Sequence, residues 1–265
     1  MMPAIDGHPH RMLQAEMQHA SKVPQITLAF WAIKIAATTL GETGGDTLSM
    51  QLNLGYLLAT AIFLPLFLVT VAVQIRARAY HAWLYWLVIV TTTTAGTTIA
   101  DFCDRSLGIG YIGGSLILFT AVLATLGLWR FTQGSVSAGD ISTPKVEAFY
   151  WATILFSNTL GTALGDFTSD DSGLGYLGSA AFFSGLLLIL ALIYATGRVS
   201  NVLLFWAAFV LTRPLGATLG DFLTKPIAHG GLDLSRGASS AVLAVCMVAA
   251  VIWCSCASQA GTRLK

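Results

Sequence analysis

The sequence predicts an all-α, polytopic transmembrane protein whose eight helices form four two-helix hairpins of one orientation. Three observations predict this fold: an apolar composition, apolar stretches of membrane-spanning length, and a motif that recurs four times. Of the 265 residues, 55% are apolar and 10% are charged, and the mean hydropathy is +0.72. A soluble domain carries roughly 25% charged residues. The composition therefore excludes a soluble enzyme, a nucleic-acid-binding protein and a disordered chain.

Each apolar stretch contains about 20 residues, the length that an α-helix needs to cross a bilayer. The expected spans are residues 24–46, 55–75, 82–101, 110–130, 148–166, 175–197, 201–222 and 238–257. Residues 1–22 are expected to be a cytoplasmic N-terminal segment, because they lack the apolar core of a signal peptide. Residues 258–265 are expected to be a cytoplasmic tail.

Basic residues divide unevenly between the two ends of these spans. Nine lie at the termini or after the second, fourth and sixth spans: Arg11, Lys22, Arg76, Arg78, Arg130, Lys145, Arg198, Arg263 and Lys265. Three lie in the opposite connections: Arg105, Lys225 and Arg236. Because cytoplasmic loops carry the excess of lysine and arginine, both termini are predicted to be cytoplasmic.

One motif, (F/Y)-W-x9-G-x3-(G/A)-D-x8-G, recurs four times and defines a two-span repeat. Its members are the tryptophans Trp31, Trp86, Trp151 and Trp206, the glycines Gly41, Gly96, Gly161 and Gly216, and the aspartates Asp46, Asp101, Asp166 and Asp221. Residues 23–130 hold repeats one and two, residues 131–147 form a cytoplasmic linker, and residues 148–257 hold repeats three and four. Every repeat spans an even number of helices, so the four copies should be related by pseudo-symmetry about the membrane normal.

With this motif the sequence resembles a bacterial integral membrane protein family built from four tandem two-span repeats with a signature tryptophan. The resemblance covers residues 23–257 and includes all four tryptophans. It implies the eight-helix architecture and a place in the bacterial cytoplasmic (inner) membrane. That family has no assigned biochemical function, so the resemblance implies none.

The motif's glycines and tryptophans favour structural roles. Each glycine is followed four residues later by glycine or alanine, and such pairs allow close helix contacts in membranes. The tryptophans lie near the cytoplasmic ends of the odd-numbered spans. They are expected to form an aromatic belt at the membrane interface or to pack within the hairpins.

The aspartates should share one depth near the extracytoplasmic end, where a carboxylate opposes the dipole of its helix. Two interpretations remain open: each aspartate caps amides in the following turn, or the four surround a cation.

Steps of four residues back from each aspartate give a polar stripe: Lys34, Thr38 and Glu42, then Thr93 and Thr97, then Asn158 and Thr162, then Arg213. Glu42 and Asp46 are the nearest candidate partners of Lys34 and Arg213. The five carboxylates of the stripe and the aspartates outnumber these two bases by three. Protons, a bound cation or water should compensate this surplus.

Carboxylate, hydroxyl and amide oxygens suit hard cations such as Mg²⁺, Mn²⁺ or Ca²⁺. The pattern favours a transporter or channel for cations, either proton-coupled or not. Its metal site would be Glu42 with the four aspartates, and the stripe would line the route. The alternative is a non-transporting membrane scaffold, sensor or partner-binding protein whose stripe is purely structural.

No enzyme is predicted, because no nucleophile–base pair or nucleotide-binding motif occurs. We expect neither haem nor a nucleotide as a cofactor, and the sequence leaves open whether a divalent cation is one. The expected partners are the lipid bilayer and a small inorganic cation, without nucleic acid, and a homo-oligomer stays open.

Overall fold

The computed structural model describes residues 21–263, which contain eight long α-helices and no strand. The helices are α2 (Leu28–Asp46), α3 (Gly55–Arg76), α4 (Ala82–Asp101), α5 (Tyr111–Gln133), α6 (Pro144–Asp166), α7 (Gly175–Ala195), α8 (Asn201–Thr224) and α9 (Arg236–Arg263). Short π-helices follow three of them: η1 (Thr47–Gln51), η2 (Phe102–Ser106) and η4 (Phe167–Asp171). The 3-10 turns are η3 (Ala138–Asp140) and η5 (Ile227–His229). Each expected span coincides with one helix.

Several helix boundaries differ from the expected spans, and α2, for example, begins at Leu28 rather than at residue 24. Helix α6 begins at Pro144 because Thr143 caps it, accepting a hydrogen bond from the Val146 amide at 3.4 Å, and proline suits the first helical position. With α5 extending through Gln133, the linker is shorter than residues 131–147. Helix α9 continues to Arg263, beyond the expected end at residue 257. Most of the expected N-terminal segment, residues 1–20, lies outside the described residues.

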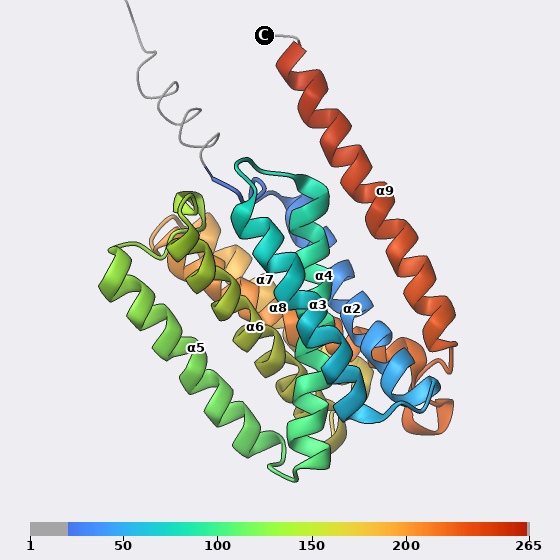
Figure 1. The fold of residues 1–265 in the computed structure, drawn as a ribbon. Coiled ribbons are helices and arrows are strands. Elements are labelled where there is room, and N and C mark those ends of the chain that lie inside the picture. The colour runs from blue at the N-terminus through green and yellow to red at the C-terminus, as the bar shows by residue number, and fades with distance from the viewer. Residues whose placement is uncertain (1–20, 264–265) are drawn as a thin grey trace, which may run out of the picture.

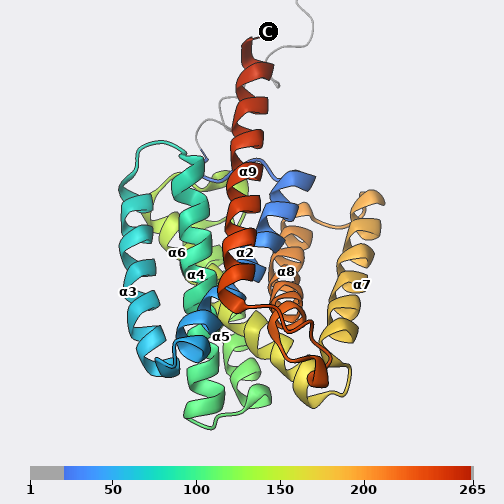
Figure 2. The same cartoon turned by 90° about the vertical axis from the view of Figure 1, so that its right-hand side faces the viewer.

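The helices form two concentric layers (Figures 1 and 2). The first helix of each repeat belongs to a closed inner ring, in which α2 contacts α4, α4 contacts α6, α6 contacts α8 and α8 contacts α2. Each second helix lies outside and packs mainly against the inner helix of the following repeat: α3 on α4, α5 on α6, α7 on α8, and α9 back on α2. The four repeats therefore interlock in a circle.

The outer layer is apolar enough for lipid. Five helices have the length and composition to cross a membrane, namely α3, α5, α7, α8 and α9. The outer helices expose large apolar side chains, among them Leu57, Leu116, Leu188 and Val245. Helices α2, α4 and α6, together with Arg213 on α8, carry the polar stripe, and these polar side chains are buried in the ring interior. This distribution indicates a membrane protein.

The motif glycines lie where neighbouring inner helices touch. A Cβ added at Gly96 would lie 3.0 Å from the Thr159 amide nitrogen and 3.1 Å from the Asn158 Cβ. The repeat-related glycines make the same contact with the next helix: Gly41 faces Thr93, Gly161 faces Arg213, and Gly216 faces Thr38 across the ring closure. Because glycine has no side chain, the backbones of the four inner helices approach one another closely at these positions.

The motif aromatics form a second ring at the opposite end from the aspartates. The first aromatic of each repeat contacts the tryptophan of the next, with ring centroids 5.5–6.0 Å apart: Phe30 with Trp86, Tyr85 with Trp151, Tyr150 with Trp206, and Phe205 with Trp31. The hydroxyls of Tyr85 and Tyr150 lie 2.7 Å apart. We call these eight residues the aromatic ring.

Three of the four tryptophans therefore do not form the expected interfacial belt, and Trp31 is half-buried. Trp86, Trp151 and Trp206 are 4%, 2% and 5% exposed, because inner helices turn them toward neighbouring repeats. The linker covers this end of the bundle, where the Trp206 Nε1 donates to the Val136 carbonyl at 2.9 Å and Ile141 is buried. The aromatic ring closes one end of the polar interior.

Candidate functional site

The polar stripe lies inside the inner ring. All twelve predicted stripe and aspartate positions are buried: Lys34, Thr38, Glu42, Asp46, Thr93, Thr97, Asp101, Asn158, Thr162, Asp166, Arg213 and Asp221. Their four-residue spacing stacks them in layers from the aspartates down to the aromatic ring. The stripe therefore faces protein, as polar groups within a membrane must.

Arg213 joins all four inner helices. From α8 its Nη2 contacts the Glu42 Oε2 of α2 at 2.9 Å, the Thr97 Oγ1 of α4 at 2.6 Å and the Thr162 Oγ1 of α6 at 2.6 Å. The side chain is 0% exposed. The predicted pairing of Arg213 with Glu42 is thus present, and it links the first repeat to the last.

Lys34 has no carboxylate partner in the described part of the chain. Its Nζ makes no hydrogen bond within the described residues and lies 4.0 Å from the centroid of the Phe209 ring. The pairing of Lys34 with Glu42 or Asp46 is wrong, because these acids lie two or three helical turns closer to the aspartate end. In place of an ion pair, Lys34 makes a cation–π contact with Phe209.

The aspartates are held in two pairs by basic residues. The Arg105 Nε lies 3.0 Å from the Asp101 Oδ1, and the Arg105 Nη2 lies 3.0 Å from the Asp166 Oδ2. The Lys225 Nζ lies 3.1 Å from the Asp221 Oδ1 and 3.6 Å from the Asp46 Oδ2. Each base belongs to the same repeat as its first aspartate and reaches the aspartate of the next repeat.

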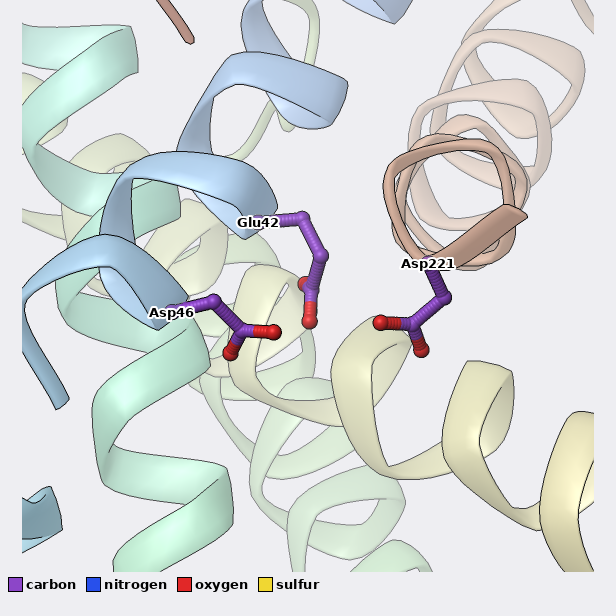
Figure 3. Close-up of side chains that lie close together, drawn as sticks. All are labelled: Glu42, Asp46 and Asp221. Atoms are coloured by element: carbon purple, nitrogen blue, oxygen red, sulfur yellow. The ribbon is translucent and has the colours of Figure 1, made fainter. Parts of the chain in front are cut away.

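Glu42 adds a third carboxylate to one of these pairs. Glu42, Asp46 and Asp221 each offer an oxygen within 4.8 Å of the others. Figure 3 shows Glu42 and Asp46 on α2 turned toward Asp221 on α8. We call these three residues the carboxylate triad. The Asp46 Oδ2 and Asp221 Oδ1 are buried and accept no hydrogen bond within the described residues.

The bases next to the aspartates stay protonated. Burial alone would lower the pKa of Lys225, but the carboxylates of Asp221 and Asp46 outweigh it and hold that pKa well above its usual value. In the same way Asp166 and Asp101 raise the pKa of Arg105 against the opposing effect of burial. Both bases are therefore cations at neutral pH.

The interpretation of the aspartates as turn caps is wrong. Asp46, Asp101 and Asp166 make no capping hydrogen bond, and the chain continues directly into π-helical turns after them. Such turns are frequent at functional sites. Nearby basic side chains, rather than backbone amides, offset the unfavourable helix dipole.

The predicted surplus of three negative charges is also wrong. The ion pairs add Arg105, Lys225 and Arg236 to Lys34 and Arg213, and the Arg236 Nε lies 3.6 Å from the Asp46 Oδ2. Asp170, which lies 3.7 Å from the Arg105 Nη2, joins the five carboxylates Glu42, Asp46, Asp101, Asp166 and Asp221, so that six carboxylates stand against five bases and the surplus is one charge rather than three. In the sequence these three bases stand only as loop charges. The missed signal is a base four residues after the aspartate in repeats two and four.

Searches against curated proteins and against solved structures find no match. The family model described as "Repeat of Unknown Function (DUF347)" matches four times, at residues 29–80, 84–135, 149–198 and 204–259. These matches reproduce the four repeats found from the motif and cover most of the chain. The chain therefore belongs to this family of tandem repeats of unknown function.

Proposed function

We propose that the protein is an integral membrane transporter or channel for small inorganic cations and that the carboxylate triad binds the cation. The observation that carries this proposal is the convergence of three buried carboxylates from two neighbouring inner helices within 4.8 Å. Charged residues in membrane-spanning helices are costly and mark ion pathways more often than idle positions. Carboxylate oxygens favour hard cations such as Mg²⁺, Mn²⁺ or Ca²⁺.

Lys225 would act as the counter-ion that an incoming cation displaces. Its ammonium lies between Asp221 and Asp46, and its side chain is 12% exposed at the end of α8. An ammonium is a compact point charge on a flexible stem. It can therefore leave as the cation enters, so that the site stays compensated in both states.

The route from the triad would follow the ring interior. Thr38, Thr93, Thr97, Asn158 and Thr162 offer oxygen atoms below the aspartates, and both polar atoms of the Asn158 amide lack a partner within the described residues. The aromatic ring closes this route at the other end, so a transport cycle would have to open it. The asymmetry of basic residues supports an orientation in which the aromatic ring lies at the cytoplasmic side of a bacterial inner membrane and both termini are cytoplasmic.

Flux measurements in liposomes test the proposal. Wild type should carry Mn²⁺ into vesicles that contain a metal-sensitive dye, and Glu42→Gln or Asp221→Asn should reduce the rate at least tenfold. Asp171→Asn is the matched control, because it removes an exposed carboxylate at the same end. No flux of Mn²⁺, Mg²⁺ or Ca²⁺ by well-folded wild type would refute the proposal. Labelling of single cysteines at 140 and 170 from opposite sides would support the orientation.

The second candidate is a scaffold, sensor or partner-binding protein without transport. The observation that favours it is the near balance of five bases against six carboxylates, which leaves a single negative charge for a ligand to neutralise. Unchanged Mn²⁺ content in cells and no flux in vesicles, together with stable folding, would favour this candidate.

A further inference from the structure

We propose that Asp101 and Asp166 form a second cation site, related to the carboxylate triad by the internal repeat, and that the Arg105 guanidinium permanently occupies it. The inference rests on the proposed function for the class of ligand, a small hard cation. It adds that the protein uses one of two related sites and that residue 105 decides this.

The two sites share one construction. Arg105 and Lys225 each lie four residues after the aspartate of their own repeat, and each bridges to the aspartate of the next repeat. Repeats two and three build one site, whereas repeats four and one build the other. A half-turn of the inner ring therefore converts one site into the other.

Asp101 and Asp166 retain free acceptor capacity. The Asp101 Oδ2 and Asp166 Oδ1 are buried without a hydrogen-bond partner in the described part of the chain, and both residues are 2% exposed. At the triad the Asp221 Oδ1 and Asp46 Oδ2 make no hydrogen bond within the described residues, but they lie 3.1 and 3.6 Å from the Lys225 Nζ and are released only when that ammonium leaves. Both pairs thus present buried oxygens that a cation can accept as ligands.

The two bases differ in how firmly they are held. Arg105 uses two nitrogens, Nε on Asp101 and Nη2 on Asp166, each at 3.0 Å, and its guanidinium lies 5.8 Å from the centroid of the Tyr111 ring. Arginine is charged at all physiological pH values and its rigid fork binds two acceptors at once. Lys225 bridges with a single nitrogen, 3.1 and 3.6 Å from its acceptors. A cation therefore displaces Arg105 from its carboxylates less easily than it displaces Lys225.

The third acid also differs. Glu42 faces the interior beside Asp46, whereas the equivalent position of repeat three is Thr162, which Arg213 contacts from the same Nη2. The nearest third acid to Arg105 is Asp170, 3.7 Å from its Nη2 on the more exposed side. Only the triad therefore places a third carboxylate toward the interior.

Equilibrium binding of Mn²⁺ to detergent-purified protein, measured by electron paramagnetic resonance, tests the inference without transport. Wild type should bind one Mn²⁺ per chain, Arg105→Lys should bind two, and Lys225→Arg should lose at least tenfold in affinity. Arg198→Lys is the control for the same chemical change, because Arg198 is exposed in a loop, and it should bind one. In Arg105→Gln, which leaves two carboxylates unpaired, Mn²⁺ should raise the melting temperature by more than in wild type.

The outcomes separate the two proposals. If wild type binds one Mn²⁺ and Arg105→Lys, eluting and melting as wild type does, also binds one, the second site is refuted and the first stands. If Arg105→Lys fails to fold, an Arg105→Gln variant that Mn²⁺ does not stabilise beyond wild type refutes it. If wild type binds none but Arg105→Lys binds one, the second site stands and the proposed role of the triad falls.

Discussion

Replacement of Arg213 with methionine tests the central junction of the inner ring. The change leaves the buried Glu42 carboxylate with a single side-chain partner, the Thr97 hydroxyl at 3.3 Å. Removing one partner of a buried ion pair costs about 3–5 kcal/mol. Thr97 and Thr162 add little to this loss, because their hydroxyls also donate to main-chain carbonyls at 3.2 and 3.3 Å. We therefore expect the free energy of unfolding to fall by about 3–5 kcal/mol.

The double variant Arg213→Met/Glu42→Gln supplies the decisive comparison. It removes both charges, so it should recover most of the loss and lie within about 1–2 kcal/mol of wild type. Unfolding in detergent can be followed by tryptophan fluorescence, since the aromatic ring contains four tryptophans. A single variant that loses less than about 1 kcal/mol, or a double variant as unstable as the single one, would refute this account of the junction.

Three further variants test packing and charge. Gly216→Leu should lower the melting temperature, because any side chain at this position meets Thr38. Gly127→Ala is the control, because the space around its added Cβ is open. A Gly216→Leu variant that melts at the same temperature as wild type would contradict close packing. Lys34→Met should raise the free energy of unfolding by about 1–3 kcal/mol, because it removes a buried ammonium that has no hydrogen-bond partner in the described residues. A lower free energy of unfolding in this variant would show that the folded protein uses the charge. Burial raises the pKa of Asp104 from 3.8 to about 6. Folded Asp104 therefore holds its proton more tightly than unfolded Asp104, and stability relative to Asp104→Asn should fall as the pH rises from 4 to 6; a constant difference would refute this.

The sequence was sufficient to predict the helices and the repeat. Apolar stretches of fixed length and a motif of constant spacing locate eight helices, and the matched residues of the family model follow the same four units. Four-residue steps also identified the buried face, because a polar stripe on an apolar helix has to avoid lipid. These features depend on periodicity along one segment.

The contacts between repeats could not be predicted in this way. Hydropathy does not say that α3 packs on α4 or that Trp151 lies against Tyr85, since both contacts join different repeats. For the same reason the roles of Arg105 and Lys225 could not be predicted, because each base also contacts the aspartate of the following repeat. Repeat-to-repeat comparison of position 105 with position 225 would have shown two bases in register. Only the packing of neighbouring repeats makes them bridges.

The circular interlock has a consequence for how the chain is made. Because every outer helix covers the inner helix of the next repeat, α2 remains uncovered on one flank until α9, which is synthesised after the other seven helices, packs against it. The early repeats must therefore remain partly assembled in the membrane, because Glu42 lacks its partner Arg213 until 171 further residues have been synthesised. Such distant closure makes assembly slow and leaves intermediates open to misassociation. A nascent chain arrested before α8 should consequently be a target for membrane quality-control proteases, whereas the completed ring should resist them.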